Sequence, residues 1–190
     1  MANVTTGFSL PYVALYAESG GTVTYSSGMV LARGVNVSLS RDNSGDINFY
    51  ADNIIAESAG GVFTNGTVTL TVDGLSENAE KLILSLPTAD GSGFVNYGSN
   101  NPPYVGLGFV VRSMNGGTAY WRAVVLPKVK FNTPNVEAAT QEETIAFQTQ
   151  ELTASIFRDD TTNKTWLKKG AYKTTEAAAE AEIKTLFSIT

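Results

Sequence analysis

The side chains with the greatest catalytic or metal-binding potential in this 190-residue chain are acids that are adjacent in the sequence, Glu142-Glu143 and Asp159-Asp160. Neighbouring residues of an extended strand point to opposite faces of a sheet, so such pairs are poorly placed to share a proton or a metal ion. Asp42, Ser44 and Asp46 have the spacing at which a calcium-binding loop begins, but the glycine and distal glutamate of such a loop are missing. We therefore expect neither acid–base catalysis nor a calcium site here.

Two side chains on which many enzymes depend are absent, because the chain has no histidine and no cysteine. This excludes Ser-His-Asp and Cys-His mechanisms, zinc sites with imidazole or thiolate ligands, and disulfides. Gly106-Leu107-Gly108 is a fragment of a dinucleotide-binding fingerprint, but it lacks the third glycine and lies inside a strand pattern. Two small residues on one face of a strand instead allow another layer to approach closely. We expect no catalytic residue, no metal and no cofactor.

Charge is sparse and unevenly placed along the chain. The net charge is −5, and residues 1–100 carry 3 basic and 9 acidic side chains, whereas residues 101–190 carry 10 and 9. Sequence-specific or tight binding of nucleic acid is not expected, since phosphate contacts need clustered Lys and Arg. The N-terminal residues show no basic segment before an apolar run, and no apolar stretch has the length of a membrane span. We expect a protein that folds in a cytoplasm and contacts no membrane.

The longest strand pattern covers residues 104–131 and folds back at Asn115-Gly116-Gly117. Apolar residues alternate on both halves: Val105, Leu107, Phe109 and Val111, then Ala119, Trp121, Ala123, Val125, Val129 and Phe131. A period of two places each set on one face of a sheet. Directly paired residues share a face, so merging the two sets requires a loop with an odd number of residues. We predict a three-residue loop, with Val111 opposite Trp121 and Leu107 opposite Val125.

Other patterns predict strands over residues 30–39, 66–74 and 144–157, and helices that begin at Ser76 and cover 174–187. Residues 88–103 read as a long polar loop. In 144–157 the apolar residues change from odd positions, such as Ile145 and Phe147, to even ones, which predicts a bulge near 149–151. Residues 1–28 contain the aromatic residues Phe8, Tyr12 and Tyr16 among glycines, and read either as an edge strand or as an arm on a neighbouring molecule.

The order of these elements predicts a mainly β (α+β) fold: an antiparallel β-sandwich or open barrel with one flanking helix and a C-terminal helix. We expect one domain over residues 1–190, with residues 1–25 as a candidate N-terminal arm and 158–190 as a C-terminal helical segment. Residues 50–57 fit neither the helical period nor the strict strand period. Their apolar side chains lie among acids, as in a loop that packs against something else.

Four segments occur in an order and spacing that resembles a known family. They are residues 46–58 (DINFYADNIIAES), 103–111 (PYVGLGFVV), 120–131 (YWRAVVLPKVKF) and 140–156 (TQEETIAFQTQELTASI). Together they resemble the major tail proteins of long, non-contractile-tailed bacteriophages, the phi13-type family. The resemblance extends over nearly the whole chain, with Gln150 where a proline is expected and Asn53 where an aspartate is expected.

The resemblance implies a tail tube protein of the virion, which is not an enzyme. Such proteins form hexameric rings that stack into a hollow tube for double-stranded DNA, assembled in the host cytoplasm with tape-measure, initiator and terminator proteins. The implied fold is a β-sandwich flanked by a helix, with sheets of neighbouring subunits joined into an inner barrel. In this family a long loop after an early strand, together with terminal segments, contacts adjacent subunits and rings. By order along the chain this is residues 41–63, with the candidate contact residues Ile47, Phe49, Tyr50, Asp52, Ile54, Ile55 and Glu57.

The uneven charge suggests one more contact between subunits. Acidic residues of the 41–63 region, Asp46, Asp52 and Glu57, would meet basic residues of a neighbour, namely Lys164, Lys168, Lys169 or Lys173. Exposed ion pairs contribute only about 0–1 kcal/mol each, so they would tune register more than affinity. The main alternative is a monomeric β-sandwich binding or adhesion module, which would show an exposed aromatic platform and no self-assembly. An enzyme, a capsid decoration protein and a tail terminator are further alternatives.

Overall fold

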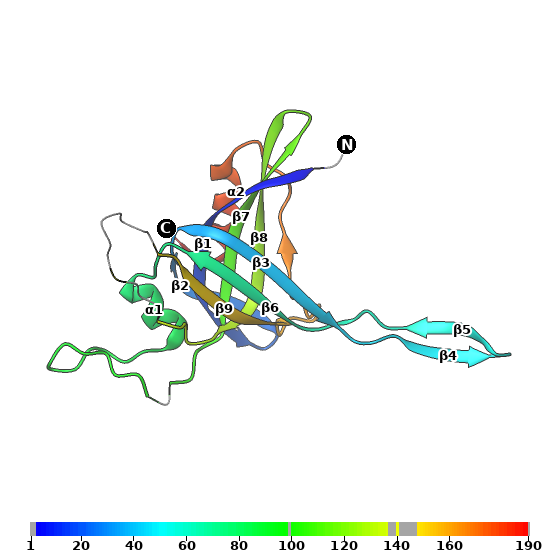
Figure 1. Cartoon of the computed structure of the whole chain (residues 1–190), viewed down its shortest axis with the longest axis horizontal. Helices are drawn as coiled ribbons and strands as arrows, with labels where there is room; N and C mark the ends of the chain where they lie inside the picture. The colour runs from blue at the N-terminus through cyan, green and yellow to red at the C-terminus, as the bar shows by residue number, and fades with distance from the viewer. Residues whose placement is uncertain (1–2, 99, 137–139, 141–147, 190) are drawn as a thin grey trace.

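Antiparallel strands make up most of the part of the chain that the computed structural model describes, which is residues 3–98, 100–136, 140 and 148–189 (Figure 1). The elements of this part are β1 (Val4–Ser19), β2 (Thr22–Val30), β3 (Gly34–Asn43), β4 (Ile47–Ala51), β5 (Ile54–Ala59), β6 (Phe63–Val72), α1 (Glu77–Leu84), β7 (Val105–Asn115), β8 (Thr118–Phe131), β9 (Gln150–Phe157), β10 (Lys168–Lys169) and α2 (Glu176–Leu186). The predicted mainly β fold with two helices is confirmed at this level.

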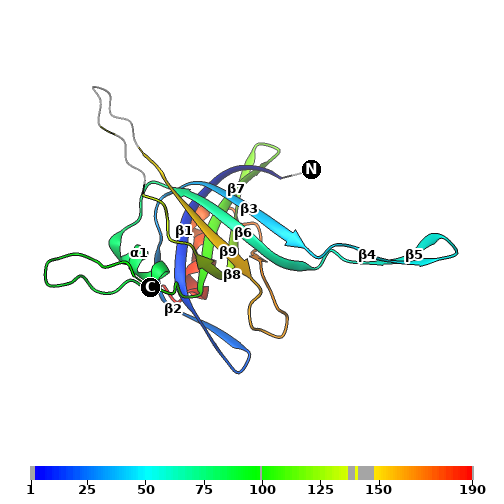
Figure 2. The ribbon, with the colours of Figure 1, turned by 60° about the horizontal axis from the view of Figure 1, so that its bottom comes forward.

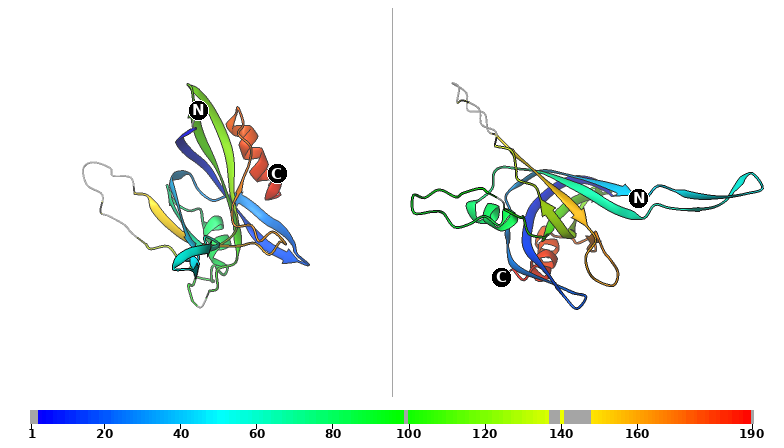
Figure 3. Two further views of the ribbon diagram at one scale, coloured as in Figure 1. Left: turned by 90° about the vertical axis from the view of Figure 1, so that its right-hand side faces the viewer. Right: turned by 90° about the horizontal axis from the view of Figure 1, so that it is seen from below.

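One large sheet forms the body of the protein, with the strand order β2-β1-β7-β8-β9-β6-β3 and β10 beside β8. The sheet bends over its own apolar side, because Val13 on β1 and Leu70 on β6 belong to one buried cluster although three strands separate them in the order. Gly34 on the edge strand β3 also lies against the ring of Phe8 on β1, the strand next to the opposite edge. The curvature is visible in Figures 2 and 3.

The turn of the central hairpin differs from the prediction. Asn115 pairs with Thr118 and Val110 with Ala123, so the loop has two residues, Gly116 and Gly117, both with positive φ. The expected three-residue loop, with Val111 opposite Trp121, is therefore wrong. Positive φ at both central residues is what a two-residue hairpin turn with the right twist requires, and glycine adopts it without a steric penalty.

The prediction failed because it assumed that only one face of the hairpin is buried. Val124 and Leu126 face the large cluster, whereas Ala123 and Val125 face a second cluster on the other side of the sheet. Farther along β8 the register shifts, and Val129 returns to the large cluster. Because both faces of the hairpin are buried, the alternation of apolar residues does not determine whether the loop has an odd or an even number of residues.

Helix α2 covers the second face of the sheet and closes over the two glycines of β7 (Figure 3, left). A Cβ atom on Gly106 would lie 2.8 Å from the Phe187 ring, and one on Gly108 would lie 2.6 Å from Ile183. The prediction that Gly106 and Gly108 permit close approach of another layer is confirmed. Of residues 158–189, α2 alone is helical, so the expected C-terminal helical segment is shorter than 158–190.

Helix α1 follows the sequence prediction closely. Ser76 is the N-cap, and its side chain accepts a hydrogen bond from the Ala79 amide at 3.3 Å. The buried residues Ala79 and Ile83 face the large cluster, and a left-handed Ser85 ends the helix two residues before Pro87. The helix covers one end of the bent sheet.

Two further predictions concern the segments beside β9 and β1. From Gln150 onward β9 pairs with β6 without a register shift, whereas Ile145 and Phe147, on which the predicted bulge depends, lie outside the described residues. Val4–Ser19 is neither an edge strand nor an arm, because β1 lies inside the sheet between β2 and β7. The edge strand of this region is β2.

Candidate interaction surface

A two-stranded hairpin projects from the body of the protein along its longest axis (Figures 1 and 2). We call residues 44–62 the arm; it contains β4 and β5, which pair only with each other among the described strands. Asp52 and Asn53 form its turn with φ values of 51° and 63°. Asp and Asn tolerate this left-handed conformation better than other residues with a side chain, so the sequence permits a tight hairpin here.

The arm carries large apolar side chains that no described residue of the same chain buries. Five of them are between 53 and 77% exposed: Ile47, Phe49, Tyr50, Ile54 and Ile55. The register pairs Tyr50 with Ile55 on one face and Ala51 with Ile54 on the other, so both faces of the arm are apolar. The candidate contact residues of the 41–63 region are thus brought together on one projecting element.

An isolated two-stranded ribbon is marginally stable in water, and monomeric proteins rarely expose large contiguous apolar patches. The arm does both. Its apolar faces are therefore the best candidate in the described residues for a surface that another molecule covers.

The root of the arm is held by hydrogen bonds between Ser44 and Val62, which lie outside β4 and β5. The Ser44 amide donates to the Val62 carbonyl at 2.8 Å, and the Val62 amide donates to the Ser44 hydroxyl at 3.3 Å. Gly60 lies directly against Asp46, where a Cβ atom would come within 2.7 Å of the Asp46 Cα. The arm therefore joins the sheet through a narrow neck.

The charged residues that are candidates for ion pairs between subunits are divided between the arm and the C-terminal third of the chain. Asp46, Asp52 and Glu57 are exposed on the arm and form no ion pair with the described residues. Of the lysines, Lys173 is already paired with Glu182, with 2.7 Å between Nζ and Oε1.

The other three lysines have no ion pair within the described residues. Lys168 and Lys169 form β10 beside β8, and Lys164 is exposed in the loop before it. Among the residues described, these three remain available to acids of another molecule.

The aromatic residues of the candidate N-terminal arm, Phe8, Tyr12 and Tyr16, pack within the protein. Phe8 contacts Phe109 edge to face, with ring centroids 5.4 Å apart, and the Tyr12 hydroxyl donates to Glu180 of α2. The Tyr16 hydroxyl donates to Asp160 Oδ2 at 2.8 Å. Burial, together with the hydrogen bond to this carboxylate, raises the pKa of Tyr16 to about 12. Phe8, Tyr12 and Tyr16 therefore hold β1 in the sheet and are poor candidates for contacts between molecules.

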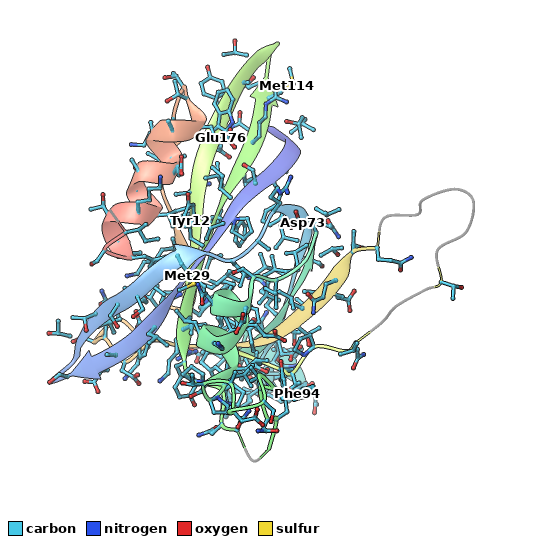
Figure 4. All side chains as sticks on the ribbon, turned by 90° about the vertical axis from the view of Figure 1, so that its left-hand side faces the viewer. Tyr12, Met29, Asp73, Phe94, Met114 and Glu176 are labelled. Carbon is cyan, nitrogen blue, oxygen red and sulfur yellow. The ribbon has the colours of Figure 1, made fainter. Side chains whose placement is uncertain are left out.

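The loop after α1 lies at the opposite end of the long axis from the arm (Figure 1), and Figure 4 labels Phe94 on this loop. Phe94 and Tyr97, on the loop after α1, are 70 and 54% exposed. The Asp90 carboxylate organises this loop by accepting hydrogen bonds from the amides of Phe94 and Ser92, and these bonds lower the pKa of Asp90. The sequence predicted a polar loop and missed its aromatic tip, although both aromatic residues are plain in the sequence.

Comparison with protein-family models and with curated proteins found no match for this chain. In the described ranges, neither helix has the length and apolarity needed to cross a bilayer. The same ranges hold no group of three or more His, Cys, Asp or Glu residues that could bind a metal ion.

Proposed function

We propose that this protein is a structural virion protein, a tail tube subunit that self-assembles into stacked hexameric rings of a phage tail. Double-stranded DNA would pass through the tube into the host without specific contacts. In this proposal the bent sheet is a β-sandwich of the tail-tube type, flanked by α1 and α2. The subunit would assemble in the host cytoplasm with tape-measure, initiator and terminator proteins. This role requires no catalysis, metal or cofactor.

The observation that carries the proposal is the projecting arm with two apolar faces. Burying one large apolar side chain contributes about 1.5–3 kcal/mol, so five contribute on the order of 10 kcal/mol. Association of two proteins costs about 4–15 kcal/mol in lost freedom. A single arm contact would thus be weak, whereas repeated contacts in a ring or stack would reinforce one another.

The edges of the sheet supply a second reason to expect self-association. At the β2 edge the register shifts where Ser27, with a φ of 53°, and Gly28 lie, and such a bulge hinders the addition of another strand. At the β3 edge the pairing with β6 is regular from Asn36 to Asp42. A regular edge invites a strand from another copy, and a head-to-tail contact gives a ring where the rotation between copies closes and a filament where it does not.

The net charge of −5 suits the proposed lumen. DNA must slide through a tube without binding to it, and rings of unpaired lysines would retain phosphate groups. An acidic chain with few basic side chains meets this requirement.

Negative-stain microscopy of the purified protein, with light scattering over a concentration series, tests the proposal. We expect rings or hollow tubes that appear above a threshold concentration. Phe49→Ser on the arm should raise this threshold. Phe94→Ser is a matched control, because Phe94 has nearly the same exposure as Phe49 but lies at the other end of the molecule. A strict monomer, with or without added tail initiator complexes, would contradict the proposal.

The exposed pair Phe94 and Tyr97 favours a second candidate, a monomeric binding or adhesion module with an aromatic platform. In that case the protein stays monomeric and Phe94→Ser abolishes ligand capture, for example on a glycan array. Phe49→Ser would leave capture unchanged. The two variants therefore separate the two functions.

A further inference from the structure

We infer that residues 158–166 act as a clamp on the root of the arm and set the direction in which the arm leaves the sheet. We call them the clamp segment. The inference rests on the proposed role of the arm in self-association, and it identifies Arg158 and Trp166 as positioning residues for that role.

The clamp segment holds Phe63, the first residue of β6 after the arm, in two ways. The Trp166 ring stacks on the Phe63 ring with centroids 4.4 Å apart and planes inclined by 3°. The Arg158 guanidinium donates a hydrogen bond to the Phe63 carbonyl oxygen. Phe63 itself is buried in the large cluster. Both its side chain and its backbone are therefore fixed just where the arm rejoins the sheet.

The two clamping side chains come together because the segment between them is a closed loop. The Asp159 amide donates to the Thr165 carbonyl at 2.8 Å, and the Thr165 amide donates to Asp159 Oδ1 at 2.7 Å. The Thr161 hydroxyl donates to the same oxygen at 2.6 Å. This closure places Arg158 and Trp166, which flank the pair, side by side against Phe63. Asp159 is 1% exposed, and its Oδ1 accepts both of these hydrogen bonds, whereas its buried Oδ2 has no hydrogen-bond partner among the described residues.

The clamp segment is in turn fastened to the interior of the sheet. Asp160 Oδ2 lies 2.6 Å from Lys128 Nζ on β8 and accepts the Tyr16 hydroxyl of β1. The Lys128 ammonium also lies 4.4 Å from the centroid of the Tyr104 ring. These contacts give the clamp a rigid base in strands that do not belong to the arm.

On the other side of the root, the backbone leaves the regular ladder. The register between β3 and β6 shifts between Asp42 and Asn43, and the Thr64 hydroxyl donates to the Asp42 carbonyl at 3.0 Å. A bulge bends the strand pair at this point. A bend held on one side by Thr64 and on the other by the clamp segment has a defined direction, and a preset direction lowers the ordering cost of each arm contact.

Hydrogen exchange at the arm root and the threshold concentration for assembly, both measured on the full chain, test this inference. The variants are Arg158→Met, which removes the guanidinium, and Trp166→Leu, which removes the stacked ring. Trp166→Phe keeps an aromatic ring, and Arg33→Met removes an exposed arginine at the opposite end of β3, where Arg33 pairs with Asp73 at 2.8 Å.

In Arg158→Met and Trp166→Leu we expect the Ser44 and Val62 amides of the unassembled protein to exchange about tenfold faster. The amides of residues 68–72 of β6 and of their partners on β9, residues 150–154, should be unchanged, which separates a loosened root from a loosened core. The threshold concentration should rise about tenfold as well, because the arm loses its preset direction. Trp166→Phe should behave nearly as the parent chain, and Arg33→Met should change neither quantity.

Unchanged exchange at Ser44 and Val62 in both variants would overturn the clamp, even if the parent chain forms tubes. Faster exchange with an unchanged threshold would overturn its role in assembly. If the parent chain never assembles, the proposed function fails, and exchange at the root then decides alone whether the clamp exists.

Discussion

Tyr16 is the residue where the sheet, the clamp segment and an ion pair meet. Its hydroxyl donates to Asp160 Oδ2 and accepts the Asp160 amide at 2.9 Å. Removing the hydroxyl in Tyr16→Phe leaves both Asp160 groups without this partner. We expect a loss of about 1–2 kcal/mol in the free energy of unfolding, measured by urea denaturation near neutral pH. A change within error would show that water replaces the hydroxyl.

The same residue predicts a loss of stability in alkali. The folded-state pKa of Tyr16, about 12, lies above the ordinary value of 10.0. Below pH 10 the hydroxyl is protonated in both states, so its contribution is fully present. Above pH 10 the unfolded chain loses the proton first, and the contribution disappears as the pH rises toward 12. Urea midpoints at about pH 8 and about pH 11 should therefore differ more in the parent chain than in Tyr16→Phe.

Gly108 tests how tightly α2 is packed on the sheet. A Cβ atom there would lie 2.6 Å from Ile183 Cγ2 and 3.1 Å from the Phe187 ring. Gly108→Ala should therefore lower the free energy of unfolding by about 1–3 kcal/mol and displace α2. Gly91→Ala is the control, since nothing lies within 4 Å of a Cβ atom at Gly91. Equal stability of the two variants, measured by chemical denaturation, would contradict this packing.

At the scale of elements, the sequence predicted those parts of the fold that one physical signal determines. Both helices have a single apolar stripe, and each begins at a hydroxyl N-cap, Ser76 or Thr175. The close approach at Gly106 and Gly108 was predicted because two residues without side chains on one face of a strand leave room for another layer. The central register was not predicted, since both faces of that hairpin are buried and the parity argument assumes one.

The arm shows what sequence reasoning missed in the candidate site. Its apolar residues lie on both faces and the register shifts between Phe49 and Tyr50, so no strict period appears. The available signal was the turn, where Asp52-Asn53 lies between two apolar pairs. The contacts between Phe63 and the clamp segment join residues about a hundred positions apart, and no local pattern could reveal them.

The turn of the arm can be changed without touching the body of the protein. Asn53 has a φ of 63°, which a β-branched residue adopts only at a cost of about 1–2 kcal/mol. Asn53→Val should open the arm, with faster hydrogen exchange in β4 and β5, while the urea midpoint of the main sheet stays unchanged. Asn53→Gly, which accepts the same φ, is the control. A lower midpoint in Asn53→Val would mean that the arm and the sheet unfold together.

At the scale of the whole molecule, the arm is an acidic and apolar projection. It carries Asp46, Asp52 and Glu57 and no basic side chain, while Lys164 and Lys169 are exposed on the C-terminal third of the chain. Lys173, which is paired with Glu182, is a weaker candidate partner than the sequence suggested. Contacts between the arm and the lysines of a neighbour would be screened by salt, so the threshold concentration for assembly should rise from dilute to molar NaCl.

Charge reversal separates these contacts from general effects of salt. Glu57→Lys should raise the threshold for assembly, and Lys169→Glu should do the same, because each places like charges together. If the two residues meet across an interface, the double variant restores the opposite charges and should assemble at a lower threshold than either single variant. Each exposed pair contributes only about 0–1 kcal/mol, but in the proposed ring the contact would recur at every subunit. If the effects of the two single variants on the free energy of assembly simply add in the double variant, Glu57 and Lys169 do not meet across an interface. The same double-mutant cycle can then be repeated with Lys164→Glu.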